Sequence, residues 1–257
     1  KAIEAGLHLW YVVRFSEDFP ADKVAEDLSK LGEVSRVAFN RTLKRASDKK
    51  AMPLTSDMIQ KLTASKADSE DPLYGYQWNL KNDGSLQDMI PDAKITKFVP
   101  GADIRAEGAW AKCTGHPDII VAVLDEGVDV THPDLAASMW VNEGEVYGST
   151  EDADGNGYAG DRHGYNFVKQ QGKITVNSRY DSGHGSHVAG AIAARNNNGL
   201  GIKSIAGGDG SADSGVRIMS CQIFSGEYVG TLLDEVRAIK YAADNGAVIL
   251  QCSWGYI

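Results

Sequence analysis

The chain of 257 residues has few cysteines, no long apolar run and no excess of basic residues. Its three cysteines, Cys113, Cys221 and Cys252, are too few and too scattered for a disulfide framework or a CxxC metal site. It has no run of 18 uninterrupted apolar residues, which excludes a membrane-spanning helix in this chain. It also lacks a basic excess: the net charge is −9, which argues against nucleic acid or an anionic membrane as the main partner.

What is present is typical of a globular protein, with 42% hydrophobic and 24% charged residues. The charge is uneven: residues 1–66 carry a balance of +3, and residues 67–257 carry −12. Residues 46–71 are polar and rich in Lys, Asp and Ser, as expected of a linker. We therefore predict two domains, with the boundary near residue 67.

The small first module reads as strand, helix, strand. Residues 9–15 are rich in β-forming side chains, and residues 34–43 alternate loosely, so both predict strands. Residues 21–31 have apolar positions at helical spacing and end at Gly32, which predicts a helix. The module is therefore expected to be α+β.

The larger module carries three continuous apolar runs, 119–124, 216–224 and 247–252, as in strands buried on both faces of a parallel sheet. Residues 231–246 predict a helix that starts at a capping box. Residues 185–195 predict another. Strands alternating with helices indicate an α/β fold. The stretch 138–183 is expected to be a long loop.

Two polar residues stand where such a sheet gathers reactive groups. Asp125 follows the run 119–124 at the carboxyl end of the expected strand, where it either caps a loop or orients another group. His184 lies between two glycines at the start of an expected helix, and a neutral imidazole is the usual general base near pH 7. For His184 alone, a metal ligand and a surface residue remain open.

Taken together, four collinear segments resemble the subtilisin-like serine proteases, the subtilases. They are residues 121–135 (VAVLDEGVDVTHPDL), 184–190 (HGSHVAG), 196–207 (NNNGLGIKSIAG) and 238–255 (AIKYAADNGAVILQCSWG). The resemblance implies a subtilisin-like, doubly wound, mostly parallel sheet. It also implies a serine endopeptidase that acts on protein or peptide substrates.

By the same resemblance, His184 is the general base of an Asp-His-Ser triad and Asp125 orients it. An extended peptide is expected to lie in a cleft as an added strand. The residues implied to line that cleft are Ser253, Trp254 and Gly255 on one edge and Ser225 and Gly226 on the other. For Trp254, a core aromatic at a strand end is the alternative.

Two positions depart from the family pattern: Glu126 replaces the usual Thr or Ser after the catalytic Asp, and Ser186 replaces a Thr. The chain also ends at Ile257, before the family's oxyanion-hole Asn and nucleophilic Ser. We therefore expect the N-terminal part of a larger subtilase, inactive alone, with an incomplete sheet. The alternative is an inactive relative or fragment that binds peptides or acts as an inhibitory or structural module.

Calcium is expected as a structural cofactor. In residues 151–161 (EDADGNGYAGD), acidic and amide side chains alternate around glycines, and hard oxygen ligands suit this ion. The expected ligands there are Asp152, Asp154, Asn156 and Asp161, with a solvated acidic turn as the alternative. The resemblance implies a second site at Asp134 and Asn197.

The position of residues 1–66 resembles that of subtilase propeptides, which act as intramolecular chaperone and inhibitor. The resemblance therefore implies that this region docks on the catalytic domain, and an unrelated appended domain is the alternative. It also implies an extracytoplasmic or secreted location, although the chain shows no signal peptide.

Overall fold

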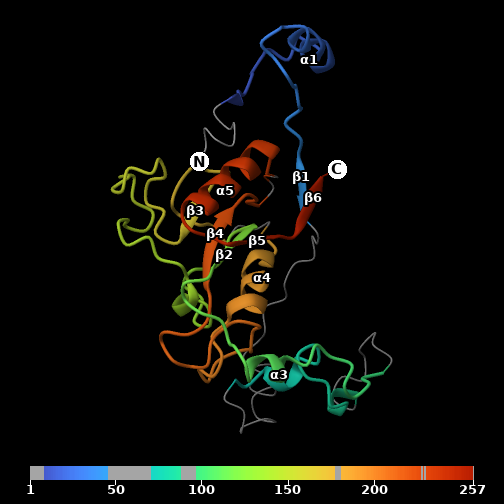
Figure 1. The fold of residues 1–257 in the computed structure, drawn as a ribbon, viewed down its shortest axis with the longest axis vertical. Helices are drawn as coiled ribbons and strands as arrows, with labels where there is room; N and C mark the ends of the chain where they lie inside the picture. The colour runs from blue at the N-terminus through green and yellow to red at the C-terminus, as the bar shows by residue number, and fades with distance from the viewer. Residues whose placement is uncertain are drawn as a thin grey trace. The chain divides into compact units, whose positions relative to one another are not determined.

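The computed structural model describes residues 9–45, 71–87, 97–176, 181–226, 228 and 230–256. The chain, drawn in Figure 1, divides into two compact units, Lys1–Asn40 and Arg41–Ile257. The boundary predicted near residue 67 falls outside the described residues and stays a prediction. Residues 41–45, which the sequence assigns to the first module, belong to the larger unit.

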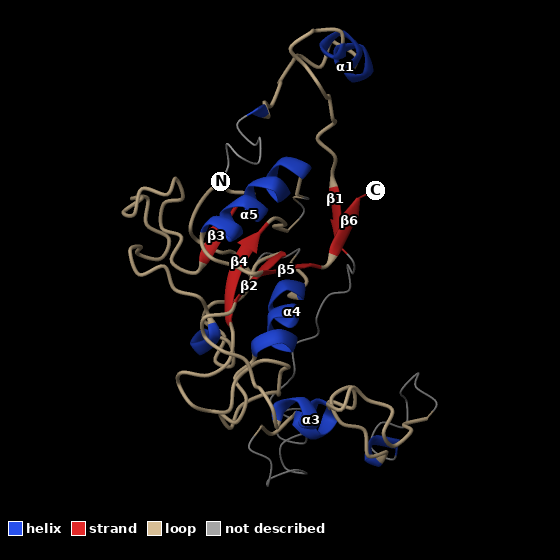
Figure 2. Ribbon diagram, viewed as in Figure 1, coloured by secondary structure: helices blue, strands red, loops and turns tan. Residues whose placement is uncertain are grey.

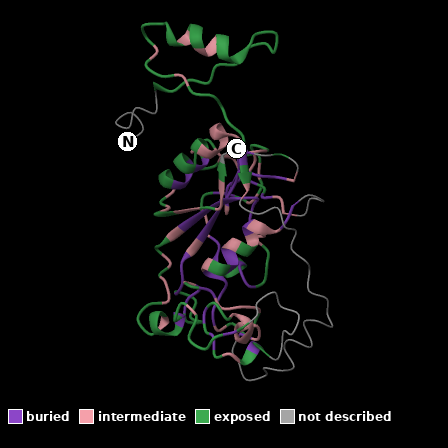
Figure 3. Cartoon of the chain, turned by 90° about the vertical axis from the view of Figure 1, so that its right-hand side faces the viewer, coloured by how far each residue is buried: buried purple, intermediate pink, exposed green. Residues whose placement is uncertain are grey.

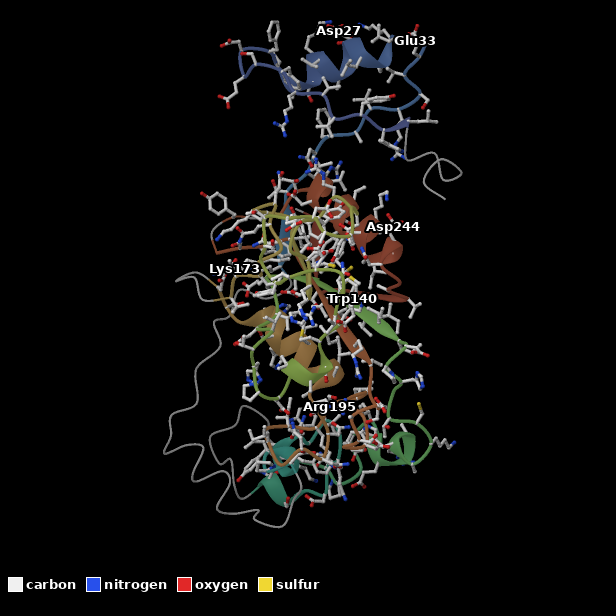
Figure 4. All side chains as sticks on the ribbon, turned by 90° about the vertical axis from the view of Figure 1, so that its left-hand side faces the viewer. Asp27, Glu33, Trp140, Lys173, Arg195 and Asp244 are labelled. Atoms are coloured by element: carbon white, nitrogen blue, oxygen red, sulfur yellow. The ribbon has the colours of Figure 1, made fainter. Side chains whose placement is uncertain are left out.

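Among its described residues, the first unit forms the helix α1 (Ala21–Ser29), which confirms the helix expected over 21–31. Lys23 Nζ lies 3.0 Å from Asp27 Oδ1, an i,i+4 ion pair on the helix surface; Figure 4 labels Asp27.

The prediction of two strands in the first module is wrong. Residues 9–15 form no strand, and of residues 34–43 only Leu43 enters one, β1 (Leu43–Arg45). Strand-forming side chains need a pleated, half-buried surface to pack on. The described part of this unit offers none, and Trp10 and Tyr11 are exposed. The expected α+β architecture is therefore not confirmed.

The larger unit is built on a parallel sheet with strand order β3-β4-β2-β5 (Figure 2). The expected apolar runs are confirmed as β2 (Ile120–Asp125), β4 (Arg217–Gln222) and β5 (Ile249–Cys252). The strand β3 (Gly164–Asn166) lies within the stretch expected to be a loop. With only three residues, it leaves no apolar run for a sequence pattern to show.

Both faces of this sheet are covered by helices. Val123 lies in an apolar cluster beneath α4 (His184–Ala193). Leu124 points the opposite way, into a cluster that includes Tyr241 of α5 (Leu232–Asp244). Figure 3 shows the buried strands between these helices. The arrangement confirms the α/β, doubly wound architecture.

The ends of α5 follow from its sequence. The Thr231 hydroxyl accepts the Asp234 N–H, and the Asp234 carboxylate accepts the Thr231 N–H at 3.0 Å, which completes the expected capping box. Gly246, with φ of 86°, turns the chain after the last helical residues.

Four short helices and a second small sheet complete the described structure. The short helices are Tyr74–Tyr76, Ser85–Gln87, α3 (Ala106–Trp110) and Ala136–Ser138. The second sheet joins β1 to β6 (Trp254–Tyr256). No helix in the described ranges is both long enough and apolar enough to cross a bilayer.

Candidate active site

The two side chains expected to react meet at the carboxyl end of β2. His184 Nδ1 lies 2.8 Å from Asp125 Oδ2 and 2.9 Å from Asp125 Oδ1. Asp125 is 1% exposed, whereas the His184 side chain is 16% exposed. A carboxylate at Nδ1 favours the tautomer that carries its proton there, which makes Nε2 the basic nitrogen. We call Asp125 and His184 the dyad.

Glycines allow α4 to approach the loop after β2 this closely. A Cβ at Gly185 would lie 2.4 Å from the Gly127 oxygen, so no larger residue fits without moving the backbone. Gly183 precedes the helix with φ of 77°, in the left-handed region that glycine adopts without strain. These two glycines bring the first residue of α4, His184, to the end of the strand.

Burial raises the pKa of Asp125, because a carboxylate removed from water loses hydration. The hydrogen bond and charge of His184, together with the positive charge of Arg45, oppose this rise in pKa. Asp125 is therefore a buried acid held beside His184 and Arg45 as specific partners, an arrangement frequent at functional sites.

Glu126, the departure from the family pattern, connects the dyad to its surroundings. Its Oε2 accepts the Ser182 N–H at 3.0 Å, the Ser182 hydroxyl at 2.8 Å and the His184 N–H at 3.1 Å. A carboxylate is stabilised at a helix N-terminus, so Glu126 steadies the start of α4. Its Oε1 forms an ion pair with the Arg45 guanidinium.

Residues 41–45 form an extended segment beside the dyad, which we call the cleft segment. Its strand β1 pairs antiparallel with β6, with Arg45 opposite Trp254, and Figure 1 shows the two strands side by side. On the other side, the Leu43 N–H donates to the Gly230 oxygen at 2.9 Å, and the Leu232 N–H donates to the Arg41 oxygen at 2.9 Å. The cleft segment is therefore a middle strand between two edges.

The residues expected to line a peptide cleft have different surroundings. Ser253, Trp254 and Gly255 lie on the edge that pairs with the cleft segment or directly before it. The Trp254 ring packs against the α5-side core, as its alternative interpretation expects, and its Nε1 donates to the Leu124 oxygen at 2.9 Å.

Ser225 and Gly226 lie in a turn just before the residues that pair with the cleft segment, and their expected role at the opposite edge of a peptide cleft stays a prediction. Ser225 pairs with Tyr228 in a tight turn, and the Gly226 N–H donates to Asp181 Oδ1 at 2.7 Å. The edge is supplied by residues 230–232 a few positions later. Sequence reasoning missed these residues because their role is carried by backbone groups, which leave no side-chain signal.

Comparison with known proteins decides the family. The model of the subtilase family, Peptidase_S8, matches residues 116–256. The chain belongs to the subtilase family. Subtilisin-like protease 1 of Plasmodium vivax is 34% identical over 137 residues, which cover 53% of this chain and 20% of that protein.

Two further subtilases show the same partial coverage. The halolysin-like extracellular serine protease Nep of Natrialba magadii is 31% identical over 152 residues, 59% of this chain and 23% of the relative. The crystal structure of fervidolysin from Fervidobacterium pennivorans is 30% identical with a TM-score of 0.36, covering 58% of this chain and 19% of that one. The chain thus spans about a fifth of the length of the curated relatives named here.

The subtilase chain also carries the acidic loop expected to bind calcium. Carboxylate oxygens of Glu145, Asp152 and Asp154 lie within 4.8 Å of one another. Asn156 Nδ2 lies beside them and donates to Asp154 and Asp161 at 3.1 Å each. Three converging carboxylates are hard oxygen donors, so this cluster fits calcium.

Glu145 was not among the predicted ligands, and Asp161, which shares the Asn156 amide with Asp154, is not one of the three converging carboxylates. Glu145 lies outside the loop in sequence and is buried, so no local spacing reveals it. Asp161 accepts the Tyr241 hydroxyl at 2.7 Å, which ties the loop to α5. Burial raises the pKa of Asp161, and these hydrogen bonds oppose the rise.

The two residues of the second expected calcium site, Asp134 and Asn197, have separate hydrogen-bond partners. Asp134 accepts the side-chain amide of Asn198, not Asn197, at 2.8 Å and the Ile202 N–H at 3.2 Å. Asn197 Oδ1 instead accepts the Lys203 ammonium at 2.6 Å. Asp134 and Asn197 thus have different partners in this structure, and the calcium site expected at them stays a prediction.

Proposed function

We propose that this chain supplies the acid and base of a serine endopeptidase that hydrolyses peptide bonds. The observation that carries the proposal is the 2.8 Å contact between His184 Nδ1 and the buried Asp125 carboxylate. Membership of the subtilase family supports the same reaction class. The nucleophilic Ser and the oxyanion Asn are proposed to lie beyond residue 257.

In this mechanism His184 moves the proton and Asp125 holds the ring. His184 Nε2 accepts the proton of the attacking Ser hydroxyl as its oxygen bonds to the peptide carbonyl carbon. Asp125 stabilises the imidazolium that results. His184 then donates the proton to the leaving amine as the C–N bond breaks, and water releases the acyl group by the same steps in the second half.

The substrate is proposed to bind as an extended strand along β6. The cleft segment supports this proposal, because its backbone already makes such a pairing beside the dyad. We further propose that residues 1–66 act as a propeptide-like region. The cleft segment, which is part of that region, blocks access to the dyad until the segment is released. The alternative, an inactive relative that binds peptides, uses the same edges without turnover.

Two accompanying proposals concern the location of the protein and its cofactor. A secreted protease is supported by the extracellular relative from Natrialba magadii. A structural calcium ion at Glu145, Asp152 and Asp154 is supported by their convergence. When bound, it would neutralise the carboxylate charge and stiffen the loop.

The proposal is tested by peptide hydrolysis with the full-length gene product. We expect His184→Ala and Asp125→Ala each to lower kcat by about 10⁴-fold or more, because the triad acts as a unit. His187→Ala is the matched control: it removes an exposed histidine of the same helix and should change kcat less than about threefold. Equal losses in all three variants would contradict the assignment. Peptide binding without turnover in the wild type would favour the alternative.

A further inference from the structure

We propose that a cavity between α5 and β3 binds a single carboxylate attached to a flat, apolar group. An aromatic acid and the C-terminal aromatic residue of a peptide both have this chemistry. We call the site the aromatic cavity. It goes beyond the proposed function and does not depend on it.

The aromatic cavity has a volume of about 240 Å³, and the two elements that contribute to it, α5 and β3, lie side by side in Figure 1. A cavity of roughly 150 Å³ already admits a benzene ring, so this one has room for a ring and a carboxylate. The residues that line it are Gly157, Tyr158, Tyr165, Phe167, Gln170 and Arg237. None of them belongs to the dyad or to the cleft segment.

Aromatic rings form the walls of the cavity. The Tyr158 ring meets the rings of Tyr165 and Phe167 edge-on, with centroids 4.9 Å and 5.8 Å apart. Tyr241 of α5 packs against the same ring, with a centroid distance of 4.8 Å. Because these rings hold one another in T-shaped contacts, the cavity is already formed and offers apolar surface to the ring of a ligand.

The polar side chains that line the cavity have no partners in the part of the chain that the structure describes. This holds for the hydroxyls of Tyr158 and Tyr165, the side-chain amide of Gln170 and the guanidinium of Arg237. Tyr165 is only 8% exposed. A largely buried hydroxyl without a partner carries a free-energy cost, which a ligand that accepts its proton would remove.

The charge of the lining selects the charge of the ligand. Among the described residues that line the cavity, Arg237 is the one that carries a formal charge, and a guanidinium binds a carboxylate through parallel N–H donors. Burial raises the pKa of Tyr158 and of Tyr165, so both hydroxyls keep their protons at neutral pH and act as donors. One positive charge and neutral donors match one carboxylate.

Two nearby carboxylates do not change this match. Asp161 accepts the Tyr241 hydroxyl at 2.7 Å, and Asp152 accepts the Gly157 N–H at 2.8 Å. Neither carboxylate is among the groups that line the cavity, so neither offers an oxygen to a ligand there. A cationic ligand would instead face Arg237, which repels it.

The first test measures binding to the 257-residue chain by calorimetry, with phenylacetate as the probe. We expect a dissociation constant of about 1 mM or below, as befits a ligand of this size. Phenylacetamide and benzylammonium keep the ring but lack the negative charge, and both should bind at least about tenfold more weakly. Equal affinity for the three probes, or no binding of phenylacetate, would overturn the inference.

The second test uses variants of the lining. Arg237→Met should weaken phenylacetate binding by about tenfold, and Tyr165→Phe, which keeps the ring, by about fivefold. Lys240→Met is the matched control on the same helix: its ammonium pairs with Asp244, so the loss should stay below about threefold. Arg237 has no partner to lose, so urea unfolding of its variant should match the wild type. Equal losses in the two methionine variants would overturn the inference.

The third test locates the probe and separates its two sources. Phenylacetate should shift the NMR signals of the Gly157 and Gln170 amides, and shifts confined to His184 would overturn the inference. The tripeptide Gly-Gly-Phe is compared with its C-terminal amide. Tighter binding of the free tripeptide than of phenylacetate, lost on amidation, would identify a peptide C-terminus as the ligand. Binding of phenylacetate without binding of the tripeptide would identify a small aromatic acid.

Discussion

Asp125 is placed where an ionised carboxylate is costly. It is almost fully buried, and burial raises its pKa above the ordinary value of 3.8. A group whose pKa is higher in the folded state stabilises folding below its unfolded pKa, and that contribution is lost as pH rises through the folded pKa. The charged form of Asp125 therefore opposes folding at neutral pH, while the proposed reaction requires it.

We expect Asp125→Asn to stabilise the 257-residue chain at pH 8 by about 1 kcal/mol, as removal of functional strain often does. The gain should shrink as the pH falls towards 3.8, where Asp125 is protonated. Urea unfolding at pH 8 and pH 4 measures both effects. A variant that is less stable than the wild type at pH 8 would contradict this account of the dyad.

At the residue scale, the sequence predicts those functional residues that lie where one local pattern ends and another begins. Asp125 ends an apolar run and His184 opens a helix between glycines, so both could be predicted. The roles of Arg45 and Glu145 could not. Arg45 meets Glu126 only through packing between segments far apart in the chain, and Glu145 lies seven positions before Asp152, outside the spacing pattern of residues 151–161.

Among the elements, α5 shows how local signals set boundaries. Its capping box and terminal glycine were readable from sequence, because both act within a few residues of the helix ends. The segment 10–15 has equally strong β-forming residues but forms no strand, since a strand exists only when a partner supplies its hydrogen bonds.

The cap of α5 provides a prediction at this scale. Thr231→Ala should lower the free energy of unfolding by about 1 kcal/mol, because the Asp234 N–H loses its acceptor. Thr231→Ser keeps a hydroxyl and should change stability by only a few tenths of that. Urea denaturation of both variants measures the difference, and indistinguishable midpoints would show that the hydroxyl does not cap the helix.

The acidic loop, residues 151–161, provides a second prediction at this scale. Calcium at about 100 times its dissociation constant should raise the free energy of unfolding by about 2.7 kcal/mol relative to EDTA. Asp154→Asn should reduce this gain, because it removes one of the three converging carboxylates. Asp118→Asn, at an exposed acid outside the cluster, should retain it. A wild-type chain that unfolds identically in calcium and EDTA would contradict the proposed site.

At the scale of the whole molecule, the α/β architecture followed from the order of apolar runs and helices. The assignment of residues 41–45 to the larger unit did not. Leu43 is fully buried in the α5-side core, next to strands more than 75 positions away, and no local pattern signals such a contact. This same contact brings a peptide-like segment beside the dyad.

The central claim is that the dyad and a Ser encoded farther along make one serine protease, and that this segment covers the dyad until it is released. Fluorophosphonate labelling of the full-length gene product, read by intact mass and peptide mapping, tests it most directly. The account predicts a single adduct on a serine outside residues 1–257 and its loss in His184→Ala. A folded full-length protein that takes up no probe, or the same labelling in His184→Ala, would contradict it.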